Sequence, residues 1–202
     1  FLDLLGMFDY GGGGYHCVHM TEEDIDIMQK KGLFAVTNPG SNLKLASGIA
    51  PVGRFLEKGV KVAIGTDGPA SNNCLDMFRE MFLVTGLAKF SQKDASAVDA
   101  VEVLKMATVN GALAMGLKEA DILAPGKLAD LIMIDLNQPN MQPIHNTPKN
   151  IVYSGSKQNV IMTIVNGKIL YENGVFFVSD SPESIYQKAE QIKQRIIKNI
   201  KE

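Results

Sequence analysis

The first 130 residues alternate short apolar runs with amphipathic stretches, and this alternation limits the possible folds more than any other feature. Apolar runs suited to strands occupy 14–18, 33–36 and 60–64, and a stretch with helical spacing follows each of them. Strands alternating with helices form parallel sheets, because a parallel neighbour requires a crossover connection. The alternation therefore predicts an α/β fold, either part of an α/β barrel or part of a doubly wound sheet.

Several helix boundaries are marked by residue type. Thr21 with Asp24 three residues later predicts a capped helix start, and Gly32 predicts its end. Further helices are expected over 49–58, 75–89 and 97–115, whereas 37–47 is expected to be a polar loop.

The pattern changes at the Ala-Pro-Gly-Lys segment 124–127. Beyond it we expect strands at 131–134, 151–153, 160–165 and 168–171, with a tight hairpin at Asn166-Gly167. The last segment, from about residue 182 to 201, is expected to be an amphipathic helix. One face of this helix collects the following apolar residues: Ile185, Ala189, Ile192, Ile196 and Ile200.

Composition excludes some classes of function. The net charge of −2 argues against nucleic-acid or membrane-surface binding, which favours a basic excess. Two cysteines in 202 residues suggest a reducing compartment, so we expect a cytoplasmic protein. No apolar run approaches the roughly 20 residues of a membrane span. The chain opens without Met inside an apolar segment, and we therefore expect a fragment of a longer protein.

Three polar clusters each follow a predicted strand. They are His16, the segment 38–45 and the Gly-Thr-Asp-Gly segment 65–68. A single strand-end Asp or His is more often a turn or structural residue than a ligand. In a barrel, however, loops at the carboxyl ends of strands meet at one mouth, so their common placement predicts a site.

These clusters belong to longer motifs with a recognisable order. The motifs are HCVHM at 16–20, NPGSNLKLASGIAPV at 38–52 and GTDGPASNN at 65–73, continued by ATVNGA at 107–112 and PGKLADL at 125–131. Together they resemble the metal-dependent amidohydrolase superfamily, in particular the branch of 5′-methylthioadenosine/S-adenosylhomocysteine deaminases and chlorohydrolases. The resemblance covers nearly the whole chain, and its branch assignment is less specific than its superfamily assignment.

The resemblance implies an architecture, namely the C-terminal part of a metal-dependent TIM barrel followed by part of a small β-sandwich and a C-terminal helix. On this basis we expect the last barrel strands and helices in 1–123, sandwich strands in 124–180 and the amphipathic helix in 181–202. In the family, strands from the N-terminus complete the sandwich.

The resemblance also implies roles for individual residues. Asp67 is expected to bind the metal and to carry the proton of the attacking water, and His16 is expected to stand near the metal and contact that water. These two are the expected catalytic residues. The expected substrate-binding residues are Asp67, Asn38, Ser41, Asn42 and Asn72, with Asn72 at the rim of the pocket.

The metal is expected to be zinc, with iron as the second candidate. A bound divalent cation lowers the pKa of water from 15.7 to about 7, and a neighbouring carboxylate can then act as base and acid. The family holds its metal mainly with a His-X-His pair and a further histidine that has a Glu beside it. This chain has only His16, His19 and His145, and no His-X-His. We therefore expect weak or absent metal binding by this chain alone.

One difference from the family concerns a substrate contact. Many relatives carry His before Asn-Pro, where this chain has Thr37, so we expect this contact to be altered.

The first functional hypothesis is a fragment of an enzyme that deaminates an adenine-type nucleoside by hydrolysis. A second is another cyclic-amine or chloro-heterocycle hydrolase of the same superfamily, and a third is a truncated module without activity. The expected partners are a small nucleoside-like substrate and either a second copy of the chain or a missing N-terminal half.

Overall fold

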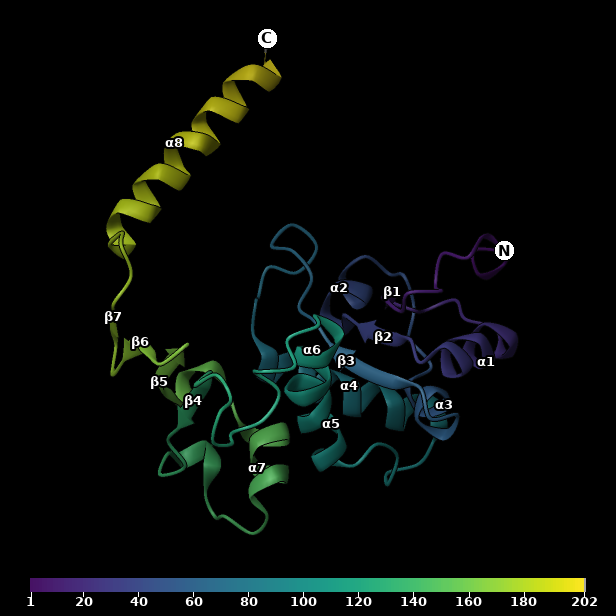
Figure 1. Cartoon of the computed structure of the whole chain (residues 1–202). Coiled ribbons are helices and arrows are strands. Elements are labelled where there is room, and N and C mark those ends of the chain that lie inside the picture. Colours follow the sequence, from purple (N-terminus) through teal and green to yellow (C-terminus); the bar gives the residue numbers. More distant parts are fainter. Residues whose placement is uncertain (202) are drawn as a thin grey trace.

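The computed structural model describes residues 1–201 and contains two β-sheets (Figure 1). The first sheet is parallel and has the order β1-β2-β3, formed by Gly13–Tyr15, Phe34–Thr37 and Lys61–Ile64. The second is antiparallel and consists of β4 Leu131–Ile134, β5 Val160–Val165, β6 Lys168–Glu172 and β7 Val175–Phe176. The predicted α/β class is confirmed.

The register of the parallel sheet brings the ends of its strands together. Tyr15 of β1 pairs with Val36 of β2, which pairs with Ala63 of β3. Because the strands are parallel, the segments that follow them leave from the same edge. The three polar clusters predicted from the sequence therefore converge.

Eight α-helices connect or flank the strands within the described residues. They are α1 Glu22–Lys31, α2 Pro39–Lys44, α3 Val52–Glu57, α4 Met77–Gln92, α5 Ala100–Ala107, α6 Val109–Ala114, α7 Thr147–Ser154 and α8 Pro182–Lys201. Three 3₁₀ turns occupy Asp3–Leu5, Pro139–Met141 and Lys157–Asn159. The buried core joins the parallel sheet to α1, α3, α4 and α5 and includes the fully buried Phe55, Val62 and Val103.

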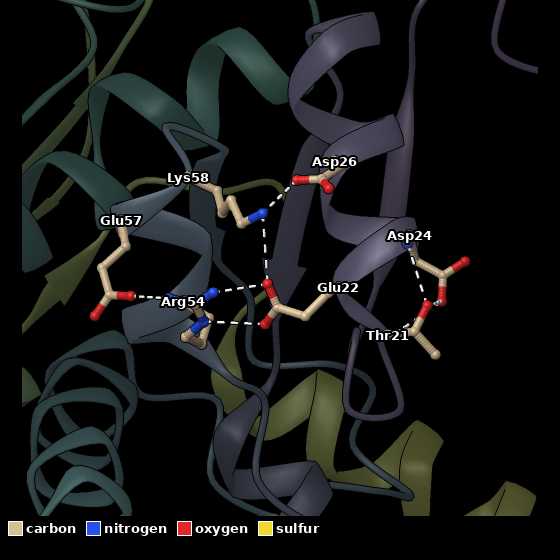
Figure 2. A network of polar contacts seen from close by, with 7 residues as sticks. All are labelled: Thr21, Glu22, Asp24, Asp26, Arg54, Glu57 and Lys58. Carbon is tan, nitrogen blue, oxygen red and sulfur yellow. Dashed lines mark hydrogen bonds and ion pairs between the residues drawn. The ribbon is translucent and has the colours of Figure 1, made fainter.

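The predicted boundaries of α1 are confirmed. The Thr21 hydroxyl accepts from the Asp24 amide, and the Asp24 carboxylate accepts from the Thr21 amide at 2.9 Å, a capping box. Gly32 closes the helix with a left-handed φ of 64°. Figure 2 shows how α1 is tied to α3: Arg54 binds Glu22, and Lys58 binds both Glu22 and Asp26.

Two expectations for the first 130 residues are corrected. Residues 37–47 are not a loop throughout, because α2 forms inside them with Pro39 at its start, where the missing N–H of proline costs nothing. The helix expected over 97–115 is two helices that meet at Thr108, whose φ of −126° and ψ of −91° are not helical.

The strand expected at 151–153 is also wrong, because these residues lie in α7. The Asn146 side chain caps this helix by accepting from the Lys149 amide at 3.0 Å, and Pro148 lies in its first turn. Val152 is buried against the helical layer of the parallel sheet. Burial of one helix face therefore outweighs the strand preference of the Ile-Val-Tyr run.

The hairpin and the final helix agree with expectation. Asn166 and Gly167 both have positive φ, 48° and 74°, and join β5 to β6. The helix α8 projects away from the rest of the chain in Figure 1, and its isoleucines 185, 192, 196 and 200 are exposed. No helix in residues 1–201 combines the length and apolar character that crossing a membrane requires.

Candidate functional site

Asp67 lies at the centre of the polar cluster, three residues beyond the end of β3. Its Oδ2 accepts a hydrogen bond from Ser41 Oγ at 2.6 Å, and its Oδ1 accepts from the Gly68 amide at 2.7 Å. The hydrogen bond from Ser41 is the largest of the causes that lower the pKa of the Asp67 carboxyl to about 2, and the bond from the Gly68 amide adds to it. Asp67 is therefore ionised at neutral pH, with about a third of its side chain exposed.

His16 faces Asp67 from the end of β1. Its Nδ1 lies 2.7 Å from Asn42 Oδ1, and its Nε2 lies 3.7 Å from Asp67 Oδ2. Because an amide oxygen only accepts, this contact places the Nδ1 proton toward Asn42 and leaves Nε2 directed toward the carboxylate. The left-handed φ of 65° at His16 turns the chain at this point. Nε2 is thus available to bind water or substrate.

An open cavity of about 320 Å³ lies beside these two residues. His16, Asn38 and Asp67 contribute its polar lining, while Val36 and Ile64 contribute apolar wall. A mainly apolar cavity with a few convergent polar groups is the usual form of a small-molecule site. Of the five residues predicted to bind substrate, Asn38 and Asp67 line this cavity.

The other three predicted substrate-binding residues are buried behind the lining. Ser41 and Asn42 lie in α2 and hold Asp67 and His16 through the contacts above. Asn72 is 2% exposed, and its amide donates to the Thr66 carbonyl and to Glu80 Oε1, both at 2.8 Å. The structure therefore places Asn72 beneath the Asp67 turn, away from the cavity lining.

Sequence reasoning overlooked Glu80, which is completely buried in α4. Its Oε2 accepts from the Gly40 amide and its Oε1 from Asn72, each at 2.8 Å. Burial raises the pKa of the Glu80 carboxyl, and the two hydrogen bonds oppose this shift. The sequence feature that could have identified Glu80 is a charged residue on the helix face that also carries Met81 and Val84, both of which are buried.

The residues present supply only part of a metal site. In residues 1–201, no three side chains of His, Cys, Asp or Glu are grouped so that they could hold an ion. Asp67 offers an ionised carboxylate with His16 beside it, whereas protein zinc sites use three or four ligands. The other two histidines, His19 and His145, are exposed, and neither lines the cavity. Thr37 is buried in β2.

The sequence profile of the amidohydrolase family matches residues 2–170, so the chain belongs to this family.

Its relatives include several nucleoside deaminases. The chain is 45% identical over 186 residues to the 5-methylthioadenosine/S-adenosylhomocysteine deaminase of Dictyoglomus thermophilum, covering 92% of this chain and 44% of that protein. It is 41% identical over 199 residues to the 5′-deoxyadenosine deaminase of Methanosarcina mazei, covering 98% and 46% respectively. The chain thus spans less than half the length of the curated relatives it matches.

A solved structure matches nearly the whole chain. An adenosine deaminase from Xanthomonas campestris with bound zinc superposes with a TM-score of 0.91 at 35% identity, covering 98% of this chain and 45% of that one.

Proposed function

We propose that this chain forms one part of a hydrolytic aminohydrolase that acts on an adenine-type nucleoside. In this proposal β1, β2 and β3 are strands of a TIM barrel, and β4–β7 belong to a small accompanying sandwich. We also propose the division at 1–123, 124–180 and 181–202, which the two separate sheets and the projecting α8 support. The likeness to an adenosine deaminase over nearly the whole chain supports this assignment.

Each site residue is proposed to have a role that its chemistry supports. Asp67 is proposed as a metal ligand and as the carboxylate that takes the proton of the attacking water and passes it to the leaving amine. Its ionisation and its exposure to the cavity support both roles. His16 is proposed to hydrogen-bond the water or the tetrahedral adduct through Nε2. Asn38 is proposed to contact the substrate, and Ser41, Asn42 and Asn72 to support the site from behind.

A divalent metal, zinc first and iron second, would lower the pKa of bound water so that hydroxide forms near neutral pH. The X. campestris adenosine deaminase contains zinc, which supports this choice. Asp67 is the ligand that the described part of this chain offers, so the remaining ligands must come from outside it. We therefore propose that the isolated chain is inactive.

The observation that carries the proposal is the Ser41–Asp67–His16 cluster beside the 320 Å³ cavity. The test is to produce this chain together with the portion of the D. thermophilum relative that it does not match. Ammonia release is then measured with 5-methylthioadenosine, S-adenosylhomocysteine and 5′-deoxyadenosine as substrates. Activity on at least one of these is expected only when both parts are present.

Two substitutions test the assigned roles in this reconstituted enzyme. Asp67→Asn is expected to reduce turnover by about 10²–10⁴, the range for acid–base catalysis, and to lower metal content. His16→Asn is expected to slow turnover while metal content is preserved. An equal fall in metal content in both variants would show that His16 is a ligand and that its assigned role is wrong.

The second candidate function is hydrolysis of another cyclic amine or of a chloro-heterocycle. It is favoured by the likeness to an E. coli guanine deaminase, which superposes with a TM-score of 0.72 at 26% identity. Guanine and atrazine are therefore included in the panel. Turnover of either one without turnover of any adenine nucleoside would replace the first proposal. A folded, metal-bound assembly with no turnover of any substrate would favour the inactive module.

A further inference from the structure

Glu80 is the one completely buried carboxylate in the described part of the chain, and the proposed chemistry does not use it. It lies on α4, on the side of that helix which faces α2 and the turn containing Asp67. Both of its oxygens accept hydrogen bonds, one from the Gly40 amide and one from the Asn72 side chain. Neither contact requires a proton on Glu80, so the carboxylate form satisfies both donors.

Through Gly40 and Asn72, Glu80 is connected to both the donor and the acceptor of the Ser41–Asp67 hydrogen bond. Gly40 directly precedes Ser41, whose hydroxyl donates to Asp67 Oδ2 at 2.6 Å. Asn72 also donates to the carbonyl of Thr66, which directly precedes Asp67. Glu80 thus contacts the donor side through one oxygen and the acceptor side through the other.

The residues around Glu80 are closely packed. A Cβ atom on Gly40 would lie 2.4 Å from Glu80 Oε1 and 2.8 Å from Asn72 Nδ2, so glycine permits the close approach. The N-terminus of α2 has no cap from its own Asn38 side chain. Glu80 takes that place from 40 residues away. The turn at Asp67 has a left-handed φ of 59°, a conformation that needs support from its surroundings.

We propose that Glu80 is a positioning residue that holds α2 and the Asp67 turn in register, so that Ser41 and Asp67 stay bonded. Its importance for catalysis rests on the proposed function of Asp67. The positioning itself does not, and it can be measured in this chain without any activity. Glu80 acts through Gly40 and Asn72 and does not touch the cavity.

The test compares two variants by nuclear magnetic resonance of the ¹⁵N-labelled 202-residue chain. In Glu80→Gln the side chain keeps its shape but has one acceptor oxygen and an NH₂ group, so it cannot accept from both donors. Asp76→Ala is the matched control, because it removes the N-cap of the same helix, where Asp76 accepts from the Phe78 amide, without touching α2 or the turn. The signals to follow are the amide protons of Gly40 and Gly68, which bind Glu80 and Asp67 respectively.

The expected result is that Glu80→Gln shifts both amide signals and Asp76→Ala shifts neither. We also expect the Gly40 amide to exchange with solvent at least about fivefold faster in Glu80→Gln, because it either loses its acceptor or keeps a neutral amide oxygen in place of a carboxylate. A shift at Gly40 alone would reduce Glu80 to a helix cap and overturn the proposal. Equal shifts in both variants would also overturn it, since they would report a general loss of stability.

A second variant covers the case in which Glu80→Gln does not fold. Asn72→Ser cuts the link on the Asp67 side and leaves the Gly40–Glu80 contact in place. It is expected to shift the Gly68 signal, while the Gly40 amide keeps its slow exchange with solvent because its bond to Glu80 remains. An unchanged Gly68 signal in this variant would contradict the proposal. If these results hold while the reconstituted enzyme shows no deamination, the proposed function fails and the positioning role stands.

Discussion

At the scale of single residues, the ionisation of Asp67 depends on a few hydrogen bonds. In the folded chain its pKa is about 2, mainly because Ser41 donates to it, whereas an unfolded aspartate titrates near about 3.9. A lowered pKa means that ionised Asp67 favours the fold. This contribution is complete above pH about 4 and is lost as the pH falls from about 4 toward 2.

Ser41→Ala is therefore expected to raise the Asp67 pKa and to reduce the loss of stability that Asp67 causes between pH about 4 and 2. A pH titration of the Asp67 carboxyl carbon by nuclear magnetic resonance measures the first effect, and acid unfolding measures the second. Ser91→Ala is the control, because that hydroxyl donates to Ala88 on α4, outside the cluster. An Asp67 pKa that stays near 2 in Ser41→Ala would refute the assigned cause.

At the scale of elements, α7 is the helix on which the second half of the chain contacts the helical layer of the first. The approach is close at Gly155, where a Cβ would lie 2.4 Å from the Ile151 carbonyl oxygen and 2.8 Å from Phe78 of α4. Gly155→Ala is expected to lower the free energy of unfolding by about 1–3 kcal/mol, as overpacking does. Urea denaturation measures the change.

Gly86→Ala is the contrasting control, since it makes the same chemical change inside α4, where a Cβ would meet nothing within 4 Å. It is expected to raise the free energy of unfolding by about 0.5–1 kcal/mol, because alanine favours the helix. Equal effects at the two sites would mean that α7 and α4 do not pack as closely as described.

At the scale of the whole molecule, the parallel sheet has two outer edges, on β1 and β3. The β3 edge is covered in part, because Asn110 donates to the Val62 carbonyl at 2.8 Å. Unpaired strand groups beside an apolar cavity favour association with another chain, since each buried unpaired group costs about 1–3 kcal/mol. We therefore expect the 202-residue chain to form dimers or larger assemblies. Size-exclusion chromatography with light scattering tests this, and a single 21.9 kDa species with cooperative unfolding would contradict it.

Metal binding is also a property of the whole molecule, because the described residues do not supply a complete set of metal ligands. With Asp67 and at most His16 available, zinc is expected to bind this chain weakly and to be removed by dialysis against a mild chelator. Metal analysis after dialysis is the measurement. One zinc per chain retained under these conditions would show that further ligands are recruited, for instance from a second copy.

Features that local chemistry controls could be predicted from the amino-acid order alone. Apolar runs located β2 and β3 to within one residue, the Thr21 capping box located α1, and Asn166-Gly167 located the β5–β6 hairpin, because each signal is complete within a few residues. The run at 14–18 only overlaps β1, which ends at Tyr15 because His16 and Cys17 turn the chain with positive φ. Parallel strand order then implied that His16, Asn38 and Asp67 converge, as the structure shows.

Which residues face the cavity and which support it became visible only in the folded chain. Asn72 and Glu80 act across gaps of 6 to 40 residues in sequence, and no local pattern encodes such contacts. The run at 151–153 is β-branched and aromatic and so favours a strand, yet burial of Val152 against the helical layer makes it part of α7. In both cases the free energy comes from burial and from satisfying buried polar groups, which depend on partners that are distant along the chain.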